Sequence, residues 1–196
     1  MRKYLLAISM AVCLMLACGP AAAQTASFTD ADDGGRERVL VVYYSFTGNT
    51  AKVAQEIAGQ TDGDVYLIET AETYDMDSIR EQLKVQREQG RWPALAEPLP
   101  DFSAYDMIFI GMPVWGGDVP PPVVSFLQQA DFNGKPVACF YTSGSRPREF
   151  MDNFRNYLKT GEIVADMDFK DAHQDRAGLA EAVTNWLKEI NILLNS

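Results

Sequence analysis

Histidine and cysteine are scarce in this chain, which limits the chemistry it can perform. It has one histidine, His173, and three cysteines among 196 residues. A single imidazole leaves no second histidine for a metal site, and no Ser-His-Asp constellation is evident. We therefore predict a solvated surface position for His173 and assign no catalytic residue and no metal ligand. Only Cys139 lies outside the N-terminal leader described below, so we expect no internal disulfide and a small core residue there.

Basic residues are also few. The chain has 17 Lys and Arg against 27 Asp and Glu, a net charge of −10. This acidity argues against binding to nucleic acid or to an anionic membrane surface. It fits a protein that docks on a basic partner, and it fits an ordinary solubilising surface equally well. The apolar fraction of 47% supports a sizeable core, and the length indicates one domain with extensions.

The chain has no apolar run long enough to be a convincing membrane span. Its first residues instead combine a basic start, an apolar stretch over residues 4–17 and three alanines that end at Ala23. This order predicts a secretory signal peptide, residues 1–23, and hence an exported, periplasmic or secreted protein. Cleavage before Cys18 with lipid attachment is the alternative, and the only route to membrane association that we consider.

A polar, small-residue segment follows the predicted leader. Residues 24–37 are typical of a flexible lead-in, and residues 38–196 then form the single folded domain. Loss of residues 1–23 removes two basic and no acidic residues, so the net charge would become −12.

Strand and helix patterns alternate from Val39 onward, which predicts an α/β sheet. Two of the strands are almost continuously apolar, as expected when helices cover both faces of a sheet. The expected strands are residues 39–44, 65–68, 107–110, 137–141 and 163–167. The expected helices are residues 49–58 (with Gly59 as the stop), 78–90, 120–129, one with Phe150, Phe154, Tyr157 and Leu158 on its apolar stripe, and one with Leu179, Val183, Trp186, Leu187 and Ile190.

The first strand leads into a loop with the sequence SFTGNT at the start of a helix. Backbone N–H groups and the helix dipole at such a position favour an anion. Ser45, Thr47 and Thr50 add hydroxyl donors, and Gly48 allows close approach or a positive φ. No Lys follows Gly48 as a P-loop requires, and one glycine is too few for a dinucleotide fingerprint. The loop therefore predicts a phosphate cradle without basic residues.

Two further loops follow apolar strands. One is residues 111–118, GMPVWGGD, and the other is residues 142–145, TSGS. Ligands of open parallel sheets bind outside the carboxyl ends of the strands, so three loops that leave those ends can converge on one ligand. Trp115 is placed to stack on a flat ring. Trp186 is expected in the core, and Trp92 is expected to pack on the surface or to cover a second ring face.

The three loops together resemble those of the flavodoxin family, in a subfamily with the patterns Ser/Thr-x-Thr-Gly-x-Thr, Pro-Val-Trp and Thr-Ser-Gly. The resemblance covers nearly all of residues 38–190. Departures are Gly116, where relatives often carry a second Trp, and residues 146–148 (RPR) in place of a glycine-rich stretch. The resemblance implies a flavodoxin-like three-layer sandwich with a five-stranded parallel sheet of order 2-1-3-4-5 and helices on both faces. It also implies flavin mononucleotide (FMN) bound by Ser45, Phe46, Thr47, Gly48, Asn49, Thr50, Pro113, Val114, Trp115, Gly116, Gly117, Thr142, Ser143, Gly144 and Ser145.

In this interpretation each loop contacts a different part of the flavin. The backbone of Phe46 matters more than its ring. The turn at Gly116 and Gly117 is either a plain tight turn or a peptide that can direct its carbonyl toward the N5–H of the singly reduced flavin. Residues 142–145 supply contacts to the pyrimidine edge.

Three functions stay open at this point. The first is a monomeric electron carrier that exchanges electrons with a basic redox partner, favoured by the acidic surface and the glycine turn. The second is an FMN-dependent oxidoreductase of the NAD(P)H:quinone type, for which Arg146 and Arg148 could bind an anionic substrate. The third is a flavin-free binding module on the same fold, against which the phosphate loop argues.

Overall fold

A computed structural model describes residues 37–75, 77–144, 149–170 and 176–191, all within the compact unit Gly35–Ser196. The predicted signal peptide and nearly all of the lead-in lie outside the described residues. Ser145, Arg146, Arg148 and His173 lie outside them too. No helix in the described ranges has the length and apolar character that a membrane crossing requires.

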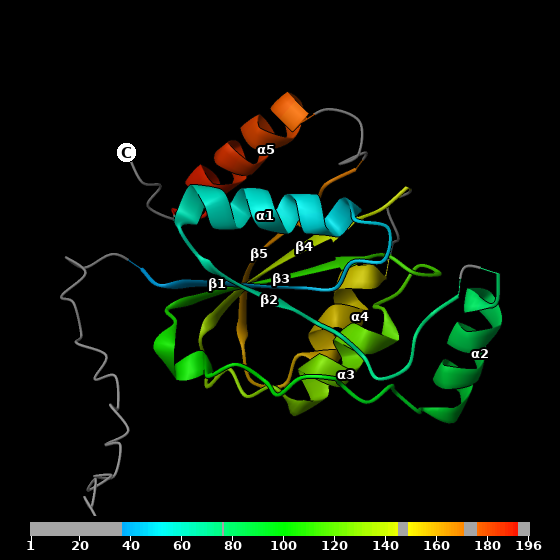
Figure 1. The fold of residues 1–196 in the computed structure, drawn as a ribbon. Helices are drawn as coiled ribbons and strands as arrows, with labels where there is room; N and C mark the ends of the chain where they lie inside the picture. Colours follow the sequence, from blue (N-terminus) through cyan, green and yellow to red (C-terminus); the bar gives the residue numbers. More distant parts are fainter. Residues whose placement is uncertain (1–36, 76, 145–148, 171–175, 192–196) are drawn as a thin grey trace, which may run out of the picture. The chain divides into compact units, whose positions relative to one another are not determined.

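The sheet has five parallel strands in the order β2-β1-β3-β4-β5, which confirms the predicted topology (Figure 1). The strands are β1 (Val39–Tyr43), β2 (Asp64–Leu67), β3 (Met107–Pro113), β4 (Pro136–Thr142) and β5 (Glu162–Asp168). The helices are α1 (Asn49–Thr61), α2 (Ile79–Gln89), α3 (Pro121–Gln129), α4 (Phe150–Tyr157) and α5 (Arg176–Glu189), with a 3-10 turn at Phe102–Ala104.

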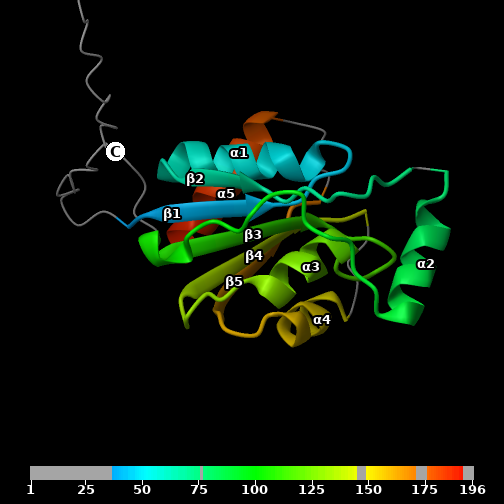
Figure 2. The same cartoon turned by 60° about the horizontal axis from the view of Figure 1, so that its bottom comes forward.

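Helices cover the sheet on both faces. Helices α1 and α5 lie on one face and α3 and α4 on the other, whereas α2 stands beyond the carboxyl ends of the strands (Figures 1 and 2). Alternate residues of the central strands therefore enter two separate apolar clusters. Val42 and Ile110 pack with Phe126 of α3, and Val41 and Phe109 belong to the cluster on the α1 and α5 face.

Two core assignments made from the sequence are confirmed. Trp186 is 2% exposed and lies edge-on to the rings of Phe109 and Phe169. Cys139 of β4 is fully buried, and burial raises the pKa of its thiol well above the ordinary value, with a smaller contribution from Asp166. A thiol with a raised pKa is a poor nucleophile at neutral pH.

Several element ends differ from prediction. Helix α1 continues past Gly59, because its buried stripe extends to Thr61, whose hydroxyl donates to the carbonyl of Ile57 at 2.8 Å. It ends at Asp62, which takes the left-handed conformation at φ 51°. Strand β3 is three residues longer than expected and includes Pro113, because it stays paired with β4 as far as Thr142.

Candidate flavin site

The loop after β1 has the geometry that its sequence predicts. Gly48 takes the left-handed conformation, with φ 86°, and α1 begins at the next residue, Asn49. Glycine adopts this conformation without the steric cost that a side chain would add. The chain therefore turns within a few residues from the end of a buried strand into the first turn of a helix.

The loop leaves several backbone donors without a protein acceptor. Within the described part of the chain, the N–H groups of residues 45–50 donate to no protein atom. The next N–H, that of Ala51, donates to the Ser45 hydroxyl at 3.2 Å, and the N–H of Lys52 donates to the Gly48 carbonyl at 3.2 Å. Unpaired donors at the amino end of a 13-residue helix carry partial positive charge. This arrangement fits a phosphate group.

Two hydrogen bonds tie the three predicted loops together. The Thr50 hydroxyl lies 2.9 Å from the Thr142 hydroxyl, and Thr50 is 1% exposed. The Val114 N–H donates to the Thr142 carbonyl at 3.0 Å. Thr142, the first residue of the third loop, thus joins that loop to the phosphate loop and to the Trp115 loop. The exposed Thr47, in contrast, makes no hydrogen bond to any residue that the structure describes, so its hydroxyl can serve a ligand.

Trp115 lies at the centre of an aromatic cluster that the sequence did not reveal. It is half-buried, and the rings of Tyr44, Phe46 and Tyr74 lie 5.3, 5.5 and 5.1 Å from it, all inclined at steep angles. The Phe46 ring thus contributes to the cluster, in addition to the backbone role that the sequence predicts. None of the three rings is parallel to Trp115, so within this cluster none stacks face to face on the indole.

Two tyrosines of this cluster, Tyr44 and Tyr74, have raised pKa values. Burial is the main reason that the pKa of Tyr44 is raised, and Tyr74 adds to the effect. Burial also raises the pKa of Tyr74 to about 12, although the hydrogen bond from its hydroxyl to Gln86 at 3.0 Å opposes the shift. Both phenols therefore keep their protons at neutral pH.

Residues 115–118 form a tight turn. The N–H of Trp115 donates to the Asp118 carbonyl and the N–H of Asp118 to the Trp115 carbonyl, each at 3.1 Å. The φ angles of Gly116 and Gly117 are 57° and 83°, as in a type I′ turn. Positive φ at both central positions explains the Gly-Gly pair.

A cavity of about 710 Å³ lies between this turn, the phosphate loop and α2. Phe46, Thr47, Val114, Trp115 and Gly116 form one wall. The opposite wall is one face of α2 and consists of Ile79, Arg80, Leu83, Lys84, Arg87 and Glu88. Three cations thus line a cavity in an acidic protein, beside the residues predicted to hold the flavin.

The loop after β4 is only partly as expected. Thr142 and Ser143 are half-buried and Gly144 is exposed, at the carboxyl end of β4. The Ser143 hydroxyl donates to the Asp168 carboxylate, with distances of 2.9 and 2.8 Å to its two oxygens. That proton is therefore unavailable to a flavin, and residues 142–144 offer mainly backbone groups.

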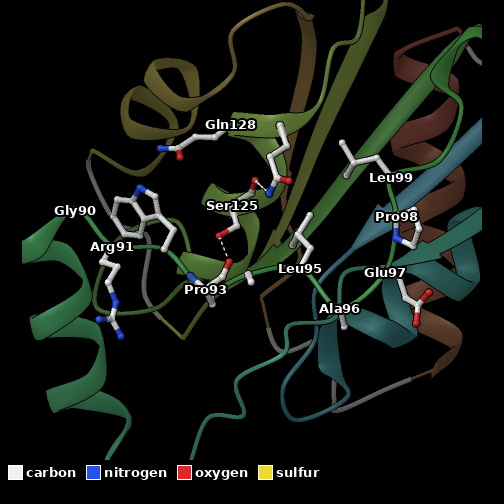
Figure 3. Close-up of a pocket in the computed structure, with 13 residues that line it drawn as sticks. Gly90, Arg91, Pro93, Leu95, Ala96, Glu97, Pro98, Leu99, Ser125 and Gln128 are labelled. Carbon is white, nitrogen blue, oxygen red and sulfur yellow. Dashed lines mark hydrogen bonds between the residues drawn. The ribbon is translucent and has the colours of Figure 1, made fainter.

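A second cavity, of about 720 Å³, lies between residues 90–99 and α3 and is lined by none of the residues described for these loops (Figure 3). The Ser125 hydroxyl donates to the Pro93 carbonyl at 2.6 Å and holds the segment against α3. Trp92 lines this cavity and lies 6.1 Å from the Tyr157 ring. Trp92 thus packs against α4, as the surface-packing interpretation expects.

Several residues around the site had almost no signal in the sequence. Arg87 and Tyr74 precede the Trp115 loop by many residues, and Asp168 lies at the end of the last strand. Their contacts arise because α2 folds back toward the Trp115 turn and because β4 and β5 end side by side. Only the acidic charge of Asp168 at a strand end could have marked any of the three.

Comparison with known proteins supports the fold and the family. A family model described as flavodoxin matches residues 38–190. The fold is similar to that of a candidate flavoprotein from Bacteroides eggerthii DSM 20697, with a TM-score of 0.68, 25% identity, and coverage of 81% of this chain and 100% of that one. A candidate flavoprotein from Bacteroides uniformis ATCC 8492 has the same TM-score and 29% identity, with coverage of 78% and 99%.

A third structure, a flavoprotein in complex with FMN from Lactobacillus acidophilus NCFM, has a TM-score of 0.61 and 24% identity, and the match covers 67% of this chain and 93% of that one. A search of curated proteins finds no match. Because the family model spans more than half of the chain, the chain belongs to the flavodoxin family.

Proposed function

We propose that this protein binds one FMN where the three loops meet. The observation that carries the proposal is the phosphate loop, with its free N–H groups at the start of α1 and its link to the other loops through Thr50 and Thr142. The FMN complex of the similar Lactobacillus acidophilus flavoprotein supports the same cofactor.

Different residues would bind different parts of FMN. The N–H groups of residues 45–50 and the hydroxyl of Thr47 hold the phosphate, with the dipole of α1 in place of a basic side chain. Trp115 contacts the ring system and excludes water from one side. The backbone of residues 142–144 binds the polar edge. When bound, FMN supplies one- and two-electron redox chemistry.

We propose that the protein acts as an electron carrier. Its acidic surface would steer it toward a basic redox partner, and this attraction would weaken as salt screens it. A monomer is sufficient for this role. The test is exchange with a basic reductase at rising ionic strength: the rate should fall steeply, whereas a rate independent of salt would contradict charge steering.

A second candidate is an FMN-dependent NAD(P)H:quinone-type oxidoreductase, and one observation favours it. The cavity of about 710 Å³ beside Trp115 combines apolar side chains with basic side chains of α2, which suits an anionic substrate. Rapid oxidation of a nicotinamide nucleotide by the purified protein with a quinone present, and without a partner reductase, would favour this candidate over the carrier.

We further propose that the protein is exported, because of the signal-peptide pattern in residues 1–23. Sequencing the amino terminus of the protein from its natural host separates the two processing routes. Cleavage after Ala23 would give a free periplasmic or secreted protein, and cleavage before Cys18 a lipid-anchored one.

A further inference from the structure

One basic residue of α2 differs from its neighbours because it reaches across the cavity to the Trp115 turn. The Arg87 Nη2 donates to the Trp115 carbonyl at 2.7 Å, and its Nε lies 3.7 Å from Oδ2 of Asp118. The side chains of Arg87 and Asp118 are 28% and 21% exposed. A short hydrogen bond from a guanidinium, combined with an ion pair, is stronger and more directional than a surface contact.

The other end of the turn is fixed from the opposite side. Oδ1 of Asp118 accepts from the N–H of Val119 at 2.7 Å and from the side-chain amide of Asn153 in α4 at 3.0 Å. Arg87 therefore completes a chain of contacts that runs from α2 through the turn to α4. Both the first and the last residue of the turn are held by side chains from other elements.

The centre of the turn remains free. A type I′ turn converts to type II′ by rotation of its central peptide, and the first central residue has a positive φ in both. Glycine at both central positions allows that rotation while Trp115 and Asp118 stay paired. A Cβ on Gly116 would lie 3.0 Å from Nη1 of Arg87, whereas a Cβ on Gly117 would meet no atom within 4 Å. Of these two Cβ positions, only the one at Gly116 is thus restricted, and the restricting group is Arg87.

We propose that Arg87 is a positioning residue, which holds the two ends of the Trp115–Asp118 turn so that only the Gly116–Gly117 peptide can rotate. In this way Arg87 sets the separation between the two one-electron reduction potentials of the bound flavin. This inference rests on the proposed FMN site. The carbonyl of the central peptide can accept a hydrogen bond from a flavin N–H only if the ends of the turn keep the peptide at the ring edge.

Arg80 provides the matched control. It lies on the same helix, lines the same cavity and carries the same charge, but it is exposed and makes none of these contacts. If the charge alone tunes the flavin, replacement of Arg80 or Arg87 should have similar effects. If the position of the guanidinium matters, only replacement of Arg87 should change the flavin potentials.

The test uses spectroelectrochemical titration of the FMN-loaded protein. Oxidised and fully reduced protein react to give the one-electron-reduced protein, and Arg87→Met should lower the equilibrium constant of this reaction by about tenfold. The separation between the first and second reduction potentials then narrows by about 59 mV. Arg87→Lys, which keeps the charge but loses the planar fork, should behave like Arg87→Met. Arg80→Met should leave the separation unchanged. Equal separations in the wild type and Arg87→Met, or equal shifts in the Arg80 and Arg87 variants, would overturn the proposal.

The flavin-free protein gives an independent readout. Amide hydrogen exchange measured by NMR should be faster at Trp115 and Asp118, whose N–H groups pair across the turn, in Arg87→Met than in Arg80→Met, and unchanged exchange would also overturn the proposal. Should Arg87→Met not fold, Asp118→Asn carries the test, because it removes the ion pair and should narrow the separation. Absence of FMN binding in the wild type would refute the proposed function itself, whereas normal binding with unshifted potentials would refute only the role of Arg87.

Discussion

The hydroxyls of Thr50 and Thr142 lie 2.9 Å apart, although 92 residues separate them in the chain. Thr50 is in the first turn of α1 and Thr142 is the last residue of β4. Their hydrogen bond is buried at the Thr50 end and joins the phosphate loop to the loop predicted to bind the polar edge of the flavin. The bond therefore connects the phosphate loop and the loop after β4 in the protein without a ligand.

This contact predicts a stability effect. Thr50→Val should lower the free energy of unfolding by about 1–3 kcal/mol, because the Thr142 hydroxyl loses its partner next to a buried side chain. The double variant with Thr142→Val should cost less than the sum of the two single variants, as a double-mutant cycle in urea would show. Additive effects would mean that the two hydroxyls do not interact.

For Thr47 we expect an effect on FMN binding and none on stability. It is exposed and makes no hydrogen bond within the described ranges of the chain. Thr47→Val should leave the urea midpoint unchanged and weaken FMN binding by about 1–3 kcal/mol, the cost of losing a hydrogen bond to a charged group. Isothermal titration with FMN measures the loss. Thr47→Ser keeps the hydroxyl and should retain near-normal affinity; a loss as large as that of the valine variant would exclude the hydroxyl as the cause.

Trp115 predicts an optical effect. An indole against the flavin ring quenches its fluorescence, so Trp115→Ala should raise the fluorescence of bound FMN and weaken binding. Trp92→Ala is the control, because Trp92 packs beside Tyr157 and does not line the cavity beside Trp115. If Trp115→Ala leaves the flavin emission unchanged, or if both variants raise it equally, the flavin ring does not lie against Trp115.

Gly111 predicts a packing effect. The strands β3 and β4 pair side by side at Gly111 and Phe140, and a Cβ on Gly111 would overlap the Phe140 ring. Because Phe140 is fully buried, Gly111→Ala should destabilise the protein by about 1–3 kcal/mol, as overpacking does. Thermal unfolding measures this, and Gly111→Ala combined with Phe140→Leu should recover part of the loss. No change in melting temperature would contradict the close approach.

The fold was largely predictable because its signals are local. Apolar strands, the loop at Gly48 and the proline-initiated α3 follow from period and turn chemistry. The alternation of strands and helices predicted an α/β sheet, and the family resemblance implied its strand order. The end of α1 was misplaced at Gly59 because a buried stripe outweighs the modest helix cost of one glycine.

The site was only partly predictable. The three loops could be found because each follows a strand. Arg87, Tyr74 and Asp168 reach the site through tertiary contacts, and no sequence period marks them. Ser143 shows the same limit, since its hydroxyl is bound to Asp168 instead of being free for a ligand.

The central claim is that the phosphate of FMN is held by residues 45–50. The most direct measurement is a parallel titration of the flavin-free protein with FMN and with riboflavin, followed by flavin fluorescence. The account predicts saturable quenching by one FMN per chain, a visible spectrum that survives desalting, and much weaker binding of riboflavin, which leaves the N–H groups of the loop without an acceptor. Equal affinity for the two flavins, or no binding of FMN, would contradict it.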